Sequence, residues 1–69
     1  MIVPRWVWAF DDNAGNELPE PVSPVFTTQF DAESWLGEQW RTLASHGARR
    51  ARLLHDGQPA SAPVLIPEP

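Results

Sequence analysis

The feature that most constrains this chain is its length of 69 residues together with the complete absence of cysteine. A chain this short forms one domain and buries only about 60% of the surface that its unfolded form exposes. Without cysteine, neither a disulfide nor a thiolate-bound zinc ion can supplement so small a core. We therefore expect a single domain over residues 1–69, with tails at 1–4 and 67–69, whose stability depends on a few large apolar side chains.

Four tryptophans and three phenylalanines are the largest of those side chains. Trp6, Trp8 and Phe10 alternate with Val7 and Ala9, which predicts a strand with aromatic rings on one face and small side chains on the other. Both faces are apolar, so we expect this strand to be interior or covered on both sides. A buried tryptophan also needs a hydrogen-bond acceptor for its indole N–H.

The segment between Thr28 and Gly47 predicts a helix. Thr28, followed by Asp31 three residues later, matches a capping box, and Gly47 is suited to the left-handed position after a helix end. The apolar stripe of this helix consists of Ala32, Leu36, Trp40 and Leu43. Trp35 lies beside the stripe. Gly37 costs about 1 kcal/mol relative to alanine in a helix, so we expect it to mark a close backbone contact.

Turn and proline signals place the remaining strands. Polar turn formers at 11–16 predict a hairpin whose returning segment, 17–25, contains three prolines and is therefore a short edge strand or merely extended. After the helix, Asp56–Gly57 predicts a hairpin between a strand over 48–55 and a last strand over 58–66. Pro59 and Pro63 interrupt that last strand, which indicates a second sheet edge.

Together these elements predict an α+β fold: a small antiparallel sheet of three to four strands with one helix packed on one face, in the order β-β-α-β-β. Because side chains alternate along a strand, the choice of the buried face is all-or-nothing. In one alternative, Trp6, Trp8 and Phe10 fill the space under the helix. In the other, they stay exposed on a face that also carries Arg50 and Arg52. The sequence leaves both alternatives open.

The second alternative predicts a binding surface, because tryptophan, phenylalanine and arginine dominate interface hot spots and an exposed apolar patch marks a partner or self-association. Our first hypothesis is a small non-catalytic protein–protein interaction module that binds a protein partner or forms a homodimer. The residues expected to contact the partner are Trp6, Trp8, Phe10, Trp35, Arg50 and Arg52.

The alternative hypothesis is a small nucleic-acid-associated regulator that binds single strands through the same face, with bases stacked on the rings. The net charge of −4 argues against this partner and against an anionic membrane surface. The sequence contains no apolar run of the roughly 20 residues needed to cross a bilayer, and its first residues do not resemble a signal peptide. We expect a cytoplasmic protein.

Side chains with catalytic potential are few. Ser45 and His46 are neighbours on the predicted helix, so their side chains point about 100° apart and cannot form a nucleophile–base pair. His55 and Asp56 supply at most two metal ligands, and the sequence contains no glycine-rich phosphate loop. We therefore expect no enzymatic activity, no cofactor, no metal ion and no small-molecule substrate.

Residues 26–40, with the pattern Asp-Ala-Glu-Ser-Trp-Leu-Gly-Glu-Gln-Trp, followed by Leu43 and Gly47, resemble a pattern found in small uncharacterised actinobacterial proteins. Those proteins also begin with an aromatic strand and end with a strand pair. More loosely, the aromatic strand, the helix and the glycine before the next strand are similar to half of a peptidoglycan-binding SPOR repeat. Neither resemblance assigns a role to any residue.

Overall fold

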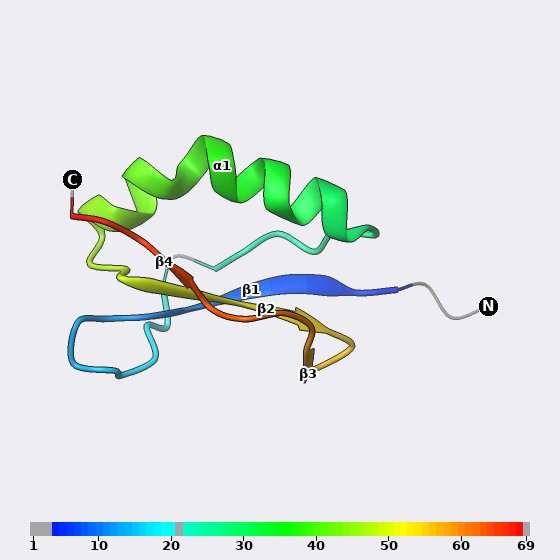
Figure 1. Ribbon diagram of the computed structural model, residues 1–69, viewed down its shortest axis with the longest axis horizontal. Helices are drawn as coiled ribbons and strands as arrows, with labels where there is room; N and C mark the ends of the chain where they lie inside the picture. Colours follow the sequence, from blue (N-terminus) through cyan, green and yellow to red (C-terminus); the bar gives the residue numbers. More distant parts are fainter. Residues whose placement is uncertain (1–3, 21, 69) are drawn as a thin grey trace.

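The computed structural model describes residues 4–20 and 22–68. These residues form one helix and a four-stranded antiparallel sheet, and the helix lies along one face of the sheet (Figure 1). The elements are β1 (Trp6–Asp11), α1 (Gln29–Ser45), β2 (Arg50–His55), β3 (Gln58–Pro59) and β4 (Val64–Leu65). The predicted α+β class is confirmed. The predicted order β-β-α-β-β is wrong, because β1 is the only strand before α1 among the described residues. Of the predicted tails, residues 1–3 and 69 lie outside the described residues.

The segment expected to return as a second strand contacts β1 without forming a strand. Its described residues pair with β1 at isolated bridges, between Asp11 and Glu17 at one end and between Trp6 and Phe26 at the other. Between them, the hydroxyl oxygen of Ser23 accepts a 3.1 Å hydrogen bond from the backbone N–H of Trp8. Prolines in the segment lack the N–H donor that a ladder requires, which explains why no strand forms. The Ser23 hydroxyl, rather than a backbone carbonyl, accepts the bond from Trp8.

Both ends of α1 follow local sequence signals. The Thr28 hydroxyl accepts a 3.1 Å hydrogen bond from the N–H of Asp31, as a helix cap requires. At the other end Gly47 has a φ of 96°, and its N–H donates to the carbonyl of Ala44. The N–H of Ala48 donates to the carbonyl of Leu43, which completes a Schellman motif. The predicted helix, its Thr28 hydroxyl cap and its glycine end are therefore confirmed. Of the reciprocal capping box, the described residues form the hydroxyl bond alone.

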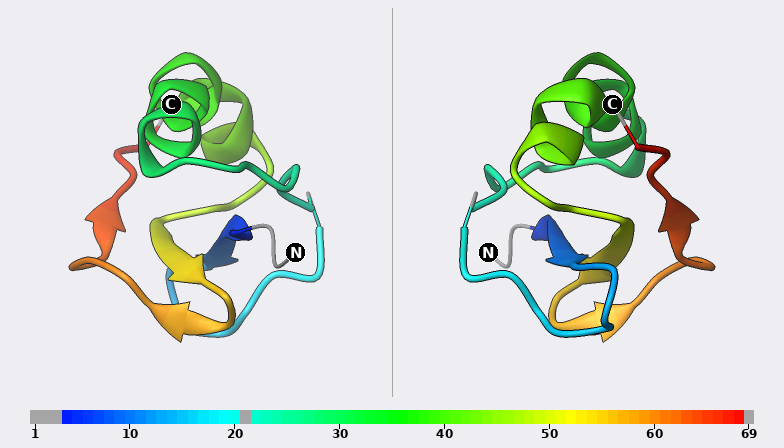
Figure 2. Two further views of the ribbon diagram at one scale, coloured as in Figure 1. Left: turned by 90° about the vertical axis from the view of Figure 1, so that its right-hand side faces the viewer. Right: turned by 90° about the vertical axis from the view of Figure 1, so that its left-hand side faces the viewer.

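The strands after α1 form around the Asp56–Gly57 turn, where both residues have positive φ, 51° and 83°, as a type I′ hairpin requires. β2 is the central strand: it pairs with β1 along one side and with β3 and β4 along the other. Figure 2 shows β3 and β4 as separate short pieces at the border of the sheet, with the chain after β4 rising beside α1. The predicted hairpin and interrupted edge strand are confirmed.

Three prolines lie where this edge tolerates them. The N–H of Ala60 donates to the carbonyl of Leu53, and the N–H of Ile66 donates to that of Arg49, so Ala60 and Ile66 direct their backbone groups toward β2. The backbone N–H and C=O groups of successive strand residues point to opposite sides, so those of positions 59, 65 and 67 point away from the sheet. Positions 59 and 67 are proline, as is 63, two residues before Leu65. The N–H of Leu65 is therefore the one outward donor over residues 63–67.

The core lies between α1 and the sheet, and it settles which face of β1 is buried. Trp8 and Phe10 pair with Leu53 and Ala51 of β2, and all four side chains face the helix. Phe10 and Leu53 are the largest fully buried side chains of the described residues. The structure thus adopts the alternative in which the aromatic rings lie under the helix. The one helix of the described residues is too short and too polar to span a membrane.

Candidate interaction site

Two of the predicted contact residues lie inside the protein. The side chains of Trp8 and Phe10 are 5% and 1% exposed, so neither contributes a surface to a partner in this structure. The indole N–H of Trp8 donates a 2.8 Å hydrogen bond to the carbonyl of Ala32 in the first turns of α1. This bond supplies the acceptor that a buried indole requires.

Trp6 and Trp35 lie at the border of the same core and are half-buried. The ring of Trp6 stacks on the imidazole of His55, with centroids 4.1 Å apart and planes 8° from parallel. The ring of Trp35 lies 6.2 Å from that of Phe10 and 5.7 Å from that of Phe26. Both tryptophans therefore border the core, and Phe26 adjoins both of them, through its bridge to Trp6 and its ring beside Trp35.

Arg50 and Arg52 lie on the other face of the sheet, where they hold a buried carboxylate. The Nε atoms of Arg50 and Arg52 lie 2.8 and 2.9 Å from Oδ2 of Asp11, and Nη2 of Arg52 lies 3.1 Å from its Oδ1. Nη2 of Arg52 also donates to Glu17 at 2.8 Å. The Asp11 side chain is only 3% exposed, against 43% and 32% for the arginines.

This geometry shifts two pKa values. Burial raises the pKa of Asp11, but the hydrogen bonds from Arg50 and Arg52, with their positive charges, outweigh it and hold the pKa below its ordinary value. Hydrogen bonds first to Glu17 and then to Asp11 raise the pKa of Arg52. The group is thus a charge-balanced cluster that is already satisfied within the chain.

The structure therefore does not bring the six predicted contact residues together on one surface. Asp11 lies on the same face of β1 as Val7 and Ala9, and the pairing with β2 places Arg50 and Arg52 on that face too. Burying the two small side chains under the helix would therefore also have buried three charged side chains there. Burial of charged groups away from water is costly, so this pairing favours burying the rings.

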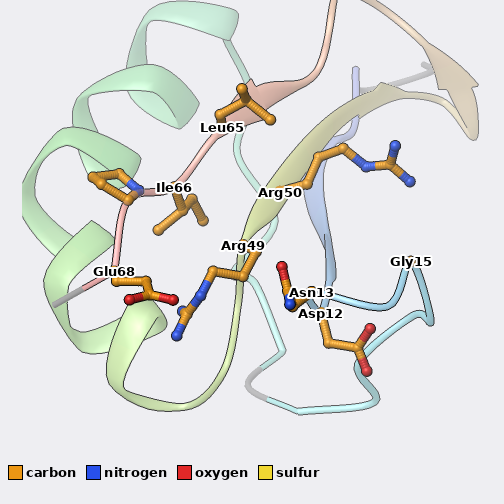
Figure 3. Close-up of a pocket in the computed structure, with 9 residues that line it drawn as sticks. Asp12, Asn13, Gly15, Arg49, Arg50, Leu65, Ile66 and Glu68 are labelled. Carbon is orange, nitrogen blue, oxygen red and sulfur yellow. The ribbon is translucent and has the colours of Figure 1, made fainter.

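One cavity opens between the turn after β1 and the chain beyond β4 (Figure 3). It measures about 600 Å³, and Asp12, Asn13, Arg49 and Glu68 are among its lining residues. Arg49 points toward the end of α1, where Nη1 donates to the carbonyls of Ala44 and Ala48 at 3.0 and 2.8 Å. Asp12 accepts bonds from two backbone N–H groups of its own turn. These polar groups stabilise a helix end and a turn.

A second hollow is a groove of about 360 Å³ between α1 and β4, and it is more apolar. Gly37 and Trp40 of α1 line one wall with Glu33, and Leu65 of β4 lines the other. Leu65 is 78% exposed, although it lies in a strand and next to the buried Ile66. We call this hollow the α1–β4 groove.

Gly37 contradicts one expectation from the sequence. A side chain at this position would meet no heavy atom within 4 Å, so no close packing inside the protein requires a glycine here. The expected close backbone contact is therefore absent within the described chain. Instead, the missing side chain leaves the helix backbone bare at the wall of the α1–β4 groove.

The sequence reasoning missed the groove, although two signals for its parts were available. On a helical wheel Gly37 falls outside the predicted core stripe, and Leu65 stands midway between Pro63 and Pro67 in an edge strand. No local sequence pattern indicates that α1 and β4 lie close together.

No three histidine, aspartate or glutamate side chains of the described residues come together in a group that could hold a metal ion. No protein-family model, no curated protein and no solved structure matches this chain. The site is thus characterised by its geometry.

Proposed function

We propose that this protein is a non-catalytic protein-interaction module that binds its partner in the α1–β4 groove. The observation that carries the proposal is the 78% exposure of Leu65 opposite the half-buried ring of Trp40. Burying apolar surface contributes about 25 cal/mol per Å², so a partner that covers this side chain gains a favourable term that the free protein lacks. The interaction hypothesis from the sequence is thus kept but moved from the aromatic strand face to the α1–β4 groove. We also propose that the protein acts in the cytoplasm.

The composition of the groove supports this proposal over an active site. Its walls combine leucine, valine, proline and tryptophan side chains with one carboxylate, Glu33. Tryptophan is among the residues that dominate interface hot spots, and it binds best when neighbouring contacts exclude water. A glycine in the wall also lets a partner approach the helix backbone.

The nucleic-acid alternative receives no such support. The rings of Trp8 and Phe10 are buried, and Arg50 and Arg52 lie on the opposite face with their charges balanced by Asp11 and Glu17. A single-strand platform needs stacking rings beside free cations on one surface. The α1–β4 groove is the better candidate, and its partner is a protein.

The test uses affinity capture from the source cells and compares two variants in which an exposed apolar residue is replaced by arginine. Leu65→Arg places a charge in the groove, and Val22→Arg places one at an equally exposed apolar position, 78%, that does not line it. Both variants are expected to keep the far-UV circular dichroism of the wild type. We expect the protein captured by the wild type to be retained by Val22→Arg and lost with Leu65→Arg. Equal capture by both variants would show that the groove is not the binding site.

A further inference from the structure

The described residues that line the α1–β4 groove include one titratable side chain, Glu33. It is exposed, and it takes part in none of the ion pairs that the described residues form. A partner that covered it with apolar groups alone would remove a carboxylate from water without compensation, which is costly. The groove therefore favours a partner that brings a positive charge to this carboxylate.

Four arginines of this chain are engaged away from the groove. Arg50 and Arg52 bond the Asp11 carboxylate on the face of the sheet away from the helix. Arg49 donates to carbonyls at the end of α1, and Arg5 lines hollows along β1. None of these four lines the groove, so the positive charge has to come from the partner.

Arg41, the one arginine of α1, is close to the groove but does not line it. Its guanidinium carbon lies over the ring of Trp40, 5.2 Å from the ring centroid. Arg41 follows Glu33 by eight residues, about 12 Å along the helix axis, which exceeds the screening length of about 8 Å at physiological salt. The two ends of this helix wall thus differ in charge, and an incoming cation is favoured at the Glu33 end.

The β4 side of the groove offers one residue for backbone pairing. Leu65 directs both its N–H and its C=O away from the sheet, whereas Pro63 and Pro67 on either side have no N–H to offer. In an antiparallel pair, such a residue exchanges both bonds with a single residue of the opposite strand. An extended peptide can therefore form one backbone pair here, and the prolines prevent a longer ladder. Its side chains must supply the rest of the contact.

The direction of β4 sets which way such a peptide runs. Figure 1 shows α1 and the chain through β4 both running toward the same end of the molecule. A peptide antiparallel to β4 therefore runs toward the N-terminal end of α1, where Glu33 lies. Residues i and i+2 of an extended segment share a face and lie about 7 Å apart, close to the distance of about 6 Å between Glu33 and Gly37 along α1. A side chain that reaches Glu33 is thus preceded, two residues earlier, by one that reaches Gly37.

We propose that the α1–β4 groove binds an extended peptide segment of a partner protein with the pattern apolar–any–cationic, read from its N-terminus. The apolar side chain packs beside Gly37 and Trp40, the middle residue pairs with the backbone of Leu65, and the arginine or lysine pairs with Glu33. This inference rests on the proposed function, because it concerns the same groove. It adds the chemistry and the direction of the segment that binds there.

The test is an NMR titration of the ¹⁵N-labelled full chain with the peptide acetyl-Leu-Ala-Arg-amide. We expect shifts of the backbone N–H signals of Gly37 and Leu65 and of the indole N–H of Trp40. So short a peptide buries little surface, and the expected dissociation constant is about 1 mM. Replacing its arginine by the uncharged citrulline should weaken binding about fivefold. The reversed peptide, acetyl-Arg-Ala-Leu-amide, has the same composition and charge and should bind more weakly as well.

A matched pair of protein variants locates the charge contact. Glu33→Gln should weaken binding of the arginine peptide about fivefold and leave binding of the citrulline peptide unchanged. Glu38→Gln removes an equally charged, exposed side chain of α1 that does not line the groove, and it should change neither. Far-UV circular dichroism checks that both variants keep the helix.

Four results would overturn the inference: no shift of the groove signals at millimolar peptide, equal affinity for the arginine and citrulline peptides, equal affinity for the reversed peptide, or equal effects of Glu33→Gln and Glu38→Gln. Failure of the proposed function is distinguishable from these. If Leu65→Arg abolishes capture of a cellular protein while Glu33→Gln retains it fully, the groove is the binding site but the cationic segment is excluded. If Leu65→Arg leaves capture unchanged, the proposed function itself is refuted, whatever the peptides do.

Discussion

The indole N–H of Trp8 donates a 2.8 Å hydrogen bond to the carbonyl of Ala32, and this contact joins β1 to the first turns of α1. Ala32 is fully buried, and its small side chain leaves room for the tryptophan ring at the point where helix and strand meet. Trp8 thus contributes both apolar burial and a directional bond between two elements 24 residues apart.

We expect Trp8→Phe to lower the free energy of unfolding by about 1–3 kcal/mol, because it removes buried volume and the bond to Ala32. The matched change Trp6→Phe, at the half-buried ring stacked on His55, should cost about 1 kcal/mol or less. Urea unfolding followed by far-UV circular dichroism measures both. Equal losses would contradict the central position of Trp8.

The Asp11 cluster predicts how much two further substitutions lower the free energy of unfolding. Asp11→Asn should destabilise the fold by about 1–3 kcal/mol, because it removes a buried carboxylate that pairs with two guanidinium groups. Glu17→Gln removes an exposed partner of the same Arg52 and should cost less than about 1 kcal/mol. Urea midpoints at neutral pH give the comparison, and a larger effect at Glu17 would refute it.

The lowered pKa of Asp11 also predicts how stability depends on pH. In the unfolded chain this carboxyl has its ordinary pKa, 3.8, so on acidification the unfolded state takes up the proton first. The stabilising contribution is therefore complete above that value and is lost as the pH falls through the lower pKa of the folded state. Asp11→Asn should flatten this acid decline, as measured by urea midpoints at a series of acid pH values. An unchanged decline would mean that other carboxyls cause it.

Two glycines should respond to the same substitution with opposite signs. Gly47→Ala forces a side chain into a φ of 96° at the end of α1 and should cost about 1 kcal/mol. Gly37→Ala lies inside α1 with free space around it and should stabilise the free monomer by up to about 1 kcal/mol. Thermal unfolding of the two variants tests the signs. A destabilising Gly37→Ala would reveal packing that the structure does not contain.

The prolines at 63 and 67 should protect the β4 edge from pairing with other strands. Replacing both by valine adds outward N–H donors on either side of Leu65, so we expect concentration-dependent association with added β-sheet signal in the infrared amide I band. Replacing Pro24, away from this edge, serves as the control. If the double variant stays as dispersed as the wild type, the prolines do not have this protective role.

Local sequence determined the elements whose geometry depends on few neighbouring residues. Thr28 and Gly47 mark the ends of the helix because a hydroxyl cap and a positive φ satisfy backbone groups within one turn. Asp56–Gly57 determined the hairpin for the same reason. The proline signal was also local, but it left open whether 17–25 forms a strand, because a bridge depends on what β1 offers at each position.

The tertiary structure alone decided the rest. Both faces of β1 are apolar, so its alternation fits either orientation until the helix and Asp11 select the face with the rings. The partners of Asp11 lie 39 and 41 residues away, and the α1–β4 groove joins a helix and an edge strand that β2 and β3 separate in the sequence. Sequence patterns determine short-range geometry, whereas the contacts that form the α1–β4 groove depend on the packing of a helix on a twisted sheet.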